Sequence, residues 1–174
     1  MSLFYYHPAS YDHIVEAVTL SLWVGFIALN AFFYYLFIFS LTEFFTLRIT
    51  IVILTTALTA VILVIPYLFS PRCYELTSAD LVIQRKVRSI KIPYNQISEV
   101  KEVNWMWKGI RIGGSGGLYG YLGLFYFSHV GKVWMYVTNR NKMLLIRCVD
   151  NKQYAISPNN LDFLTGAKKL IGNV

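Results

Sequence analysis

A glycine-rich stretch at residues 111–127, RIGGSGGLYGYLGLFYF, contains residue types that could bind phosphate through backbone amides. A nucleotide P-loop requires Lys and then Ser or Thr after its last glycine, but Leu118 and Tyr119 follow the GGSGG run. The dinucleotide spacing G-x-G-x-x-G also fails, because Tyr119 occupies the position of its third glycine. The Tyr, Phe and Leu residues that follow favour a strand over a helix. We expect a connection between strands here rather than an anion-binding nest.

The three histidines could act as general bases or metal ligands. His7 and His13 lie near Asp12, but the number and spacing of these groups do not suit a metal site. His129 stands alone in a predicted turn, where a histidine is usually solvated. The sequence shows no Cys-His or Ser-His-Asp arrangement. We therefore expect a protein that is not an enzyme and that uses no metal and no cofactor.

The chain contains two long uncharged runs that could span a membrane and so determine on which side of it these residues lie. The chain is 56% hydrophobic, and residues 17–42 and 49–71 contain no charged side chain. Each run exceeds the roughly 20 residues that a helix needs to cross the hydrocarbon layer. Buried core helices are the alternative, but runs of this length are unusual in so small a soluble protein. A signal peptide fits worse, because Asp12 and Glu16 precede the first run in place of a basic segment.

The charge distribution predicts the topology of the chain. Residues 43–48 are too few for anything but a tight hairpin, so both termini share one compartment. Of the 16 Lys and Arg residues, 15 follow Ser70, together with 6 of the 9 Asp and Glu residues. The positive-inside rule then places both termini in the cytoplasm. We predict an N-terminal cytoplasmic segment (1–16), a transmembrane hairpin (17–71) and a basic cytoplasmic domain (72–174). Nucleic acid is not expected as a partner, because the domain has no recognisable nucleic-acid-binding motif.

The C-terminal domain alternates short apolar segments with turn residues, a pattern typical of antiparallel strands. About seven strands are predicted, at 73–77, 81–85, 88–93, 97–103, 132–138, 143–149 and 153–156. The period then changes to that of an amphipathic helix, for which Ser157 is the predicted cap and Pro158 the first residue. The predicted fold class is a membrane α-helical hairpin followed by an all-β domain that a C-terminal helix caps.

Four segments of this domain resemble bacterial PH-domain (pleckstrin-homology-like) proteins. They are KIPYNQISEV (91–100), RIGGSGGLYGYLGLF (111–125), VWMYVTNRNKMLLIRC (133–148) and YAISPNNLDFL (154–164). In that family a PH-like domain often follows a pair of membrane helices. The resemblance implies a multi-pass protein of the bacterial inner membrane, and it makes residues 113–123 a connection between strands.

The resemblance also implies a lipid-binding role for basic residues of the first β-hairpin. In PH-like domains such residues can hold an anionic lipid headgroup, and Arg85, Lys86, Arg88 and Lys91 occupy that region here. A solvated turn is the simpler alternative. Tethering to the bilayer raises the local headgroup concentration and favours weak contacts of this kind. Membrane lipids are therefore the first expected partner.

A protein partner or a second copy of the chain is the competing expectation. Trp105 and Trp107 flank Met106, and exposed Trp often anchors a protein interface. The alternative is that one Trp lies in the core and the other on the bilayer. Asn30 is the one strongly polar side chain in the spans, and it could pair within the hairpin, which we favour, or between copies. An accessory or immunity subunit of a larger membrane complex is one such assembly.

Overall fold

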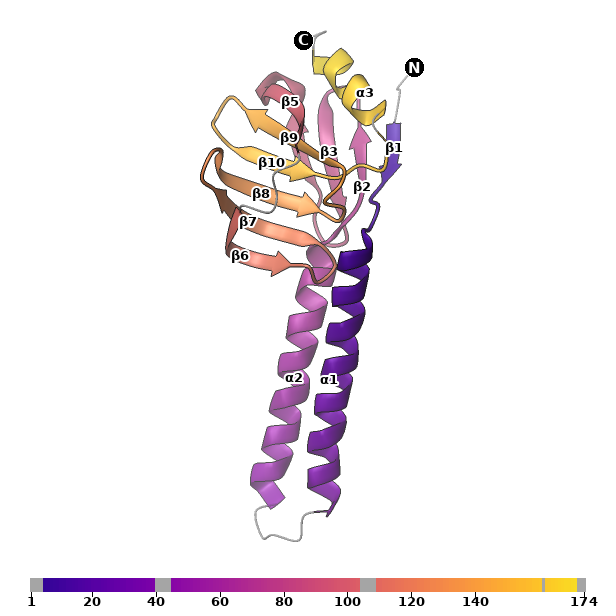
Figure 1. Ribbon diagram of the computed structural model, residues 1–174, viewed down its shortest axis with the longest axis vertical. Helices are drawn as coiled ribbons and strands as arrows, with labels where there is room; N and C mark the ends of the chain where they lie inside the picture. Colours follow the sequence, from indigo (N-terminus) through magenta and orange to yellow (C-terminus); the bar gives the residue numbers. More distant parts are fainter. Residues whose placement is uncertain (1–4, 40–44, 104–108, 161, 172–174) are drawn as a thin grey trace.

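The computed structural model describes residues 5–39, 45–103, 109–160 and 162–171. It places a pair of long helices below a β-rich domain (Figure 1). The helices are α1 (His13–Phe39) and α2 (Phe45–Phe69), and both are long and apolar enough to cross a membrane. Of the most apolar 18 residues in each helix, only 6% are buried within the chain. Core helices of a soluble protein would be mostly covered, so this exposure favours the membrane interpretation of the two runs.

Asn30 connects the two helices near their middle. Its amide Nδ2 donates to the Phe26 carbonyl oxygen at 2.8 Å and to Thr59 Oγ1 at 3.0 Å. Its Oδ1 accepts from Thr56 Oγ1 at 3.1 Å. Both donor positions of the amide are thus used inside the hairpin, which is the pairing that the sequence favoured. The contact between copies stays a prediction that this geometry does not support.

Among the described residues, ten strands form two sheets. The four-stranded sheet has the order β1-β2-β3-β4 and contains β1 (Tyr5–Pro8), β2 (Pro71–Leu76), β3 (Asp80–Arg85) and β4 (Ile90–Pro93). The six-stranded sheet has the order β5-β9-β10-β8-β7-β6 and contains β5 (Ile97–Val103), β6 (Gly109–Gly116), β7 (Tyr121–Phe127), β8 (Gly131–Val137), β9 (Met143–Cys148) and β10 (Gln153–Ile156). A single 3₁₀ turn, η1 (Tyr94–Gln96), leads from the first sheet into the second.

All seven predicted strands are present within a few residues of their predicted bounds. The structure differs from the prediction in having three further strands and one parallel pair of strands. The strand β6 comes from the glycine-rich part of residues 111–127, whose composition hid it. The strand β7 lies where Tyr, Phe and Leu favoured a strand, although the resemblance made residues up to 123 a connection. The strand β1 lies before the first helix. The strand β10 inserts between β9 and β8, so it runs antiparallel to β9 but parallel to β8.

The C-terminal helix α3 (Asp162–Ile171) covers the end of the domain away from α1 and α2 (Figure 1). It packs against β5, β2 and η1. The predicted cap at Ser157 is wrong, because the Ser157 hydroxyl is buried and accepts the amides of Thr138 at 2.9 Å and Asn139 at 3.1 Å. Pro158 instead forms an isolated bridge with Ala9. Both residues therefore hold the N-terminal segment and the sheet together ahead of the helix.

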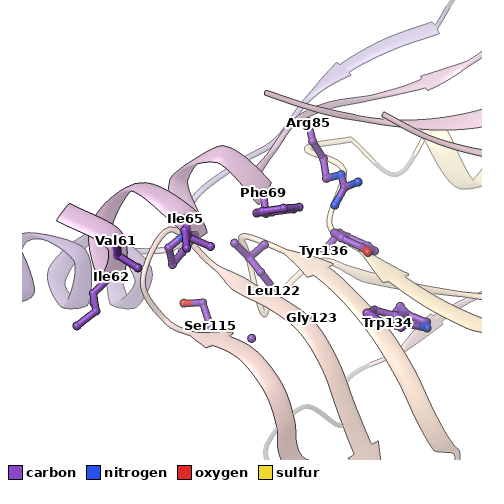
Figure 2. A pocket seen from close by; sticks show the side chains of 12 residues that line it. Val61, Ile62, Ile65, Phe69, Arg85, Ser115, Leu122, Gly123, Trp134 and Tyr136 are labelled. Atoms are coloured by element: carbon purple, nitrogen blue, oxygen red, sulfur yellow. The ribbon is translucent and has the colours of Figure 1, made fainter. Parts of the chain in front are cut away.

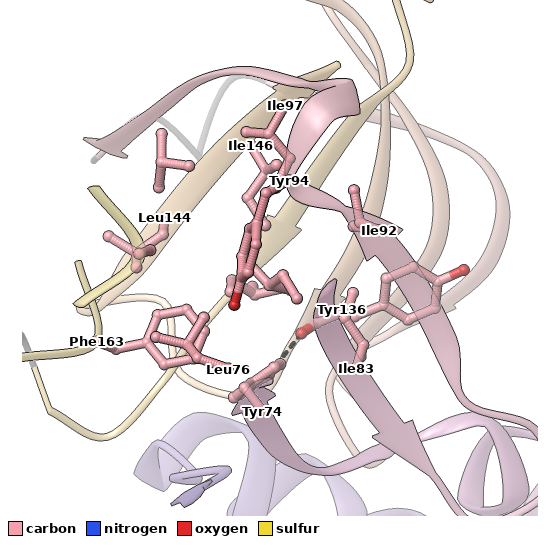
Figure 3. Close-up of a cluster of buried hydrophobic side chains, with 14 of the residues drawn as sticks. Tyr74, Leu76, Ile83, Ile92, Tyr94, Ile97, Tyr136, Leu144, Ile146 and Phe163 are labelled. Carbon is pink, nitrogen blue, oxygen red and sulfur yellow. Dashed lines mark hydrogen bonds between the residues drawn. The ribbon is translucent and has the colours of Figure 1, made fainter. Parts of the chain in front are cut away.

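The domain has two apolar clusters. The first lies between the two sheets and α3, and it includes Tyr74, Tyr94 and Phe163 (Figure 3). The Tyr74 hydroxyl donates to the Tyr136 carbonyl oxygen at 2.7 Å within this cluster. The second cluster joins Val103 of β5 to side chains of β7, β8 and β9. The six-stranded sheet therefore bends enough to bury side chains on both of its faces.

Two glycines face each other where β6 pairs with β7. Gly114 lies opposite Gly123, and both have positive φ angles, +117° and +111°. A Cβ added to Gly123 would overlap the carbonyl oxygen of Gly113, and one added to Gly114 would overlap that of Leu122. Close approach of the two backbones thus requires glycine at these positions, which explains the composition of the stretch without a phosphate.

We expect Gly123→Ala to destabilise this hairpin. The strained backbone alone costs about 1–3 kcal/mol, and the overlap with Gly113 adds to that cost. Gly113→Ala is the matched control, because a Cβ there meets no atom within 4 Å. Denaturation of the full chain in detergent should show a lower midpoint for Gly123→Ala and a change within about 0.5 kcal/mol for the control. Equal midpoints for the two variants would contradict the packing described here.

Candidate functional site

The candidate functional site lies at the junction between the helices and the domain, where basic and aromatic side chains lie close together. Ser70 alone separates the end of α2 from the start of β2, and it is fully buried. Its hydroxyl donates to the Tyr67 carbonyl oxygen at 2.8 Å. Because β3 runs back beside β2, with Arg85 opposite Pro71, the β3–β4 connection (residues 86–89) returns to the end of α2. Residues far from the helix in sequence thus reach its last turn.

The structure brings three of the four predicted lipid-binding residues to this connection. The Arg85 guanidinium lies 5.3 Å from the ring centroid of Phe69, and its Nε donates to the Arg88 carbonyl oxygen at 2.6 Å. The Lys86 ammonium lies 3.1 Å from the ring centroid of Tyr67. Arg88 is exposed, whereas Lys91 lies further from the helix on β4. The connection thus presents basic side chains directly beside the end of α2.

A groove of about 490 Å³ runs between α2 and the six-stranded sheet (Figure 2). Val61, Ile65 and Phe69 line its α2 side, and Leu122 and Trp134 belong to its sheet side. Of the described residues that line the groove, Arg85 is the single charged one. Sequence reasoning missed the groove, because its walls come from α2, β6, β7 and β8, and no linear pattern marks their approach.

The connection between β6 and β7 docks on both helices. The Tyr119 amide donates to Thr19 Oγ1 at 3.0 Å, and Trp23 Nε1 donates to the Tyr119 hydroxyl at 2.8 Å. The Tyr119 ring also meets the Tyr67 ring of α2, with centroids 5.4 Å apart. Tyr119 adopts a positive φ of +56° to make these contacts. The prediction that residues 113–123 connect strands is therefore correct only for residues 117–120, because the rest of that range belongs to β6 and β7. This short connection holds the six-stranded sheet against the helix pair.

Asp12 fastens the start of α1 to the domain. Its Oδ1 accepts the Val15 amide at 2.8 Å, which caps the helix, and its Oδ2 accepts from Arg140 N and Nε at 3.1 and 3.2 Å. Burial alone would raise the pKa of the Asp12 carboxyl, but these hydrogen bonds and the Arg140 charge outweigh it and hold the pKa below its usual value. The pair joins α1 to the connection between β8 and β9.

The histidines that were considered and rejected as metal ligands do not converge. The His7 ring packs edge-on against the Phe163 ring, with centroids 5.3 Å apart. On the surface, His13 Nδ1 lies 3.6 Å from Glu16 Oε2. Within the described ranges, no three His, Cys, Asp or Glu residues group as metal ligands would. Trp105 and Trp107, the predicted partner-binding pair, lie outside the described residues.

Comparison with known proteins gave one match. A family model described as "Bacterial PH domain" matches residues 72–169, which is more than half of the chain. The matched segment runs from β2 into α3 and therefore contains the basic connection and the sheet side of the groove. Comparisons with curated proteins and with solved structures gave no match.

We expect Asp12→Asn to lower the free energy of unfolding at pH 7 by about 1.5–3 kcal/mol, the range for hydrogen bonds to a charged group. Because the folded-state pKa of Asp12 is lowered, its contribution is present above the unfolded-state pKa of about 3.9 and is lost as the pH falls through the folded value. The difference between the wild-type chain and the variant should therefore shrink below about pH 4. Denaturation of both chains in detergent at pH 7 and pH 3 measures this difference in the free energy of unfolding.

Asp150→Asn is the control, because Asp150 pairs with Lys152 at an exposed site. Surface ion pairs contribute little. If Asp12→Asn and Asp150→Asn had the same effect at pH 7, Asp12 would not fasten α1 to the domain.

Proposed function

Because the chain belongs to the bacterial PH-domain family, we propose that it holds a PH-like domain against the cytoplasmic face of the inner membrane, where the domain binds anionic lipid headgroups. The β3–β4 connection is the contact surface. Its task is binding or scaffolding rather than catalysis, and it needs no cofactor.

The position of the basic residues beside the last turn of α2 carries this proposal. A helix of 25 residues at about 1.5 Å per residue is long enough for the hydrocarbon layer, so the end of α2 lies near a headgroup region. Lys86 and Arg88 are attached to that end through β2 and β3. Each Lys or Arg close to an anionic surface contributes about 1 kcal/mol. The exposed Val87 between them, with 58% of its surface accessible, adds an apolar contact at the same place.

Two observations support the cytoplasmic orientation. Residues 5–8 pair with β2, so the N-terminal segment and the domain lie on one side of the membrane. The side of the membrane with the domain carries 15 of the 16 Lys and Arg residues, and Arg48, near the hairpin turn, is the remaining one. This asymmetry is what the positive-inside rule requires.

Charge reversal at Lys86 and Arg88 tests headgroup binding. In nanodiscs of phosphatidylcholine, added phosphatidylglycerol should raise the unfolding temperature of the wild-type chain, and high salt should remove the gain. The double variant Lys86→Glu and Arg88→Glu should lose about 2 kcal/mol of this stabilisation, because two basic contacts are removed.

The matched control is Lys168→Glu with Lys169→Glu, which changes the net charge equally on α3, at the far end of the domain. This variant should keep the gain from phosphatidylglycerol. Loss of the gain in both variants would show an effect of net charge alone, and retention in both would refute the headgroup contact.

A protein partner is the second candidate, and the edge strand β6 favours it. Among the strands that the structure describes, β6 pairs with β7 alone, and Ile110 and Ile112 are 69% and 54% exposed. An unpaired edge with exposed apolar side chains is a surface that another strand can extend. The partner is either a second copy of the chain or a larger membrane complex in which this chain is an accessory or immunity subunit.

If the β6 edge binds a partner, Ile110→Lys with Ile112→Lys should reduce the particle mass measured in mild detergent to that of one chain. Val149→Lys is the control, since Val149 is equally exposed but lies outside β6. A wild-type chain that is monomeric and purifies with no other protein would count against this candidate.

A further inference from the structure

We propose that the groove between α2 and the six-stranded sheet binds one anionic phospholipid, with an acyl chain along α2 and the phosphate at Arg85. The proposal rests on the membrane placement proposed above. It adds a defined binding site for one lipid to the general attraction between the basic residues and an anionic membrane surface. The groove is of ordinary size for a ligand site, since such sites enclose roughly 300–1,000 Å³.

The depth of the groove decides the chemistry of its occupant. The uncharged run begins at Ile49, and about 20 helical residues cross the hydrocarbon layer, so the layer ends close to Phe69. Val61 and Ile65 line the groove within that span. Water is poorly available at this depth, and these walls offer it few partners. A hydrocarbon chain from the surrounding bilayer can fill the space.

Arg85 decides the charge of the occupant. It is half-buried at the end of the groove, where the rings of Phe69 and Tyr136 lie at 5.3 and 5.4 Å from its guanidinium (Figure 2). The hydrogen bond from Nε to the Arg88 carbonyl oxygen fixes its orientation. None of the ion pairs found among the described residues includes Arg85. A half-buried guanidinium without a carboxylate favours an anion, and its planar shape suits phosphate.

The two ends of the groove thus match the two ends of a phospholipid. The apolar end lies at hydrocarbon depth, and the cationic end lies at the level where α2 ends and headgroups begin. The exposed indole of Trp134 lines the sheet side of the groove, and Trp is typical of the membrane–water interface. A packed helix from a second copy would fill the apolar end but would leave Arg85 without an anion. We therefore commit to a lipid.

Photolabelling of the full chain tests the site. The probe is phosphatidylglycerol with a diazirine in its acyl chain, present at a trace level in phosphatidylcholine nanodiscs, and labelled peptides are mapped by mass spectrometry. Lipids that only surround the helices label α1 and α2. A lipid in the groove also labels Leu122 and Trp134, which lie on β7 and β8. We expect this labelling, and we expect it to be several-fold weaker with a phosphatidylcholine probe.

Three variants make the test specific. Ile65→Trp should fill the groove and reduce labelling of Leu122 and Trp134 at least fivefold. Val64→Trp, the neighbouring and equally exposed position that does not line the groove, should leave it unchanged. Arg85→Gln should remove the preference for phosphatidylglycerol over phosphatidylcholine. Thermal unfolding of each variant confirms that the chain is folded.

Three outcomes would overturn the proposal: no label on β7 or β8, equal labelling in Ile65→Trp and Val64→Trp, or an unchanged headgroup preference in Arg85→Gln. A two-chain particle without such labelling would assign the groove to a second copy. The test of headgroup attraction changes Lys86 and Arg88, whereas the test of the groove changes Ile65 and Arg85. The two results are therefore independent of each other. A salt-dependent gain from phosphatidylglycerol that persists without groove labelling would leave the proposed function standing and remove only this site.

Discussion

The direct passage of α2 into β2 is the constraint on which the rest of the structure depends. With Ser70 as the only residue between them, the domain has no linker on which to turn. The first strand leaves the last helical turn, and the second strand returns to it. The orientation of the domain relative to the two helices is therefore a property of the fold.

Contacts distant in sequence reinforce this constraint. Asp12 and Arg140 join the start of α1 to the sheet, and β1 adds the N-terminal segment to the edge of β2. Tyr119 brings the β6–β7 connection onto both helices. Each contact uses a different part of the domain, so together they oppose rotation about the α2–β2 joint. Burial of Asp12 and Arg140 has a desolvation cost, which the hydrogen bonds to the Asp12 carboxylate and the Arg140 charge outweigh, and the pair is compatible with only one arrangement of helix and sheet.

This rigid arrangement gives the two proposed lipid contacts different physical roles. Charges such as those of Lys86 and Arg88 attract an anionic surface over roughly a Debye length, about 8–10 Å, and they select only the sign of charge. The groove acts by contact and can select both a chain and a headgroup. A domain on a flexible tether would need to find the surface repeatedly, whereas the proposed membrane placement keeps both features at the interface.

Much of the architecture is predictable from local pattern. The two helices follow from uncharged runs of bilayer length, and seven strands follow from alternation and turn residues, because side-chain period is a local property. The family model that matches residues 72–169 confirms the family resemblance. That resemblance was visible in short continuous segments of the sequence. The strand β6 was missed because glycines give no alternation, and the helix cap was placed wrongly because Ser157 has partners elsewhere in the chain.

The pairings between distant segments were decided by the tertiary structure alone. The strand β1, the parallel pairing of β10 with β8, the contact of Tyr119 with two helices and the groove around Arg85 all join residues that are remote in sequence. Composition states which groups are available, for instance a basic cluster or a glycine-rich stretch. The position of such groups at the end of α2 depends on backbone pairing and packing across the whole domain, and these interactions leave no periodic signal along the chain.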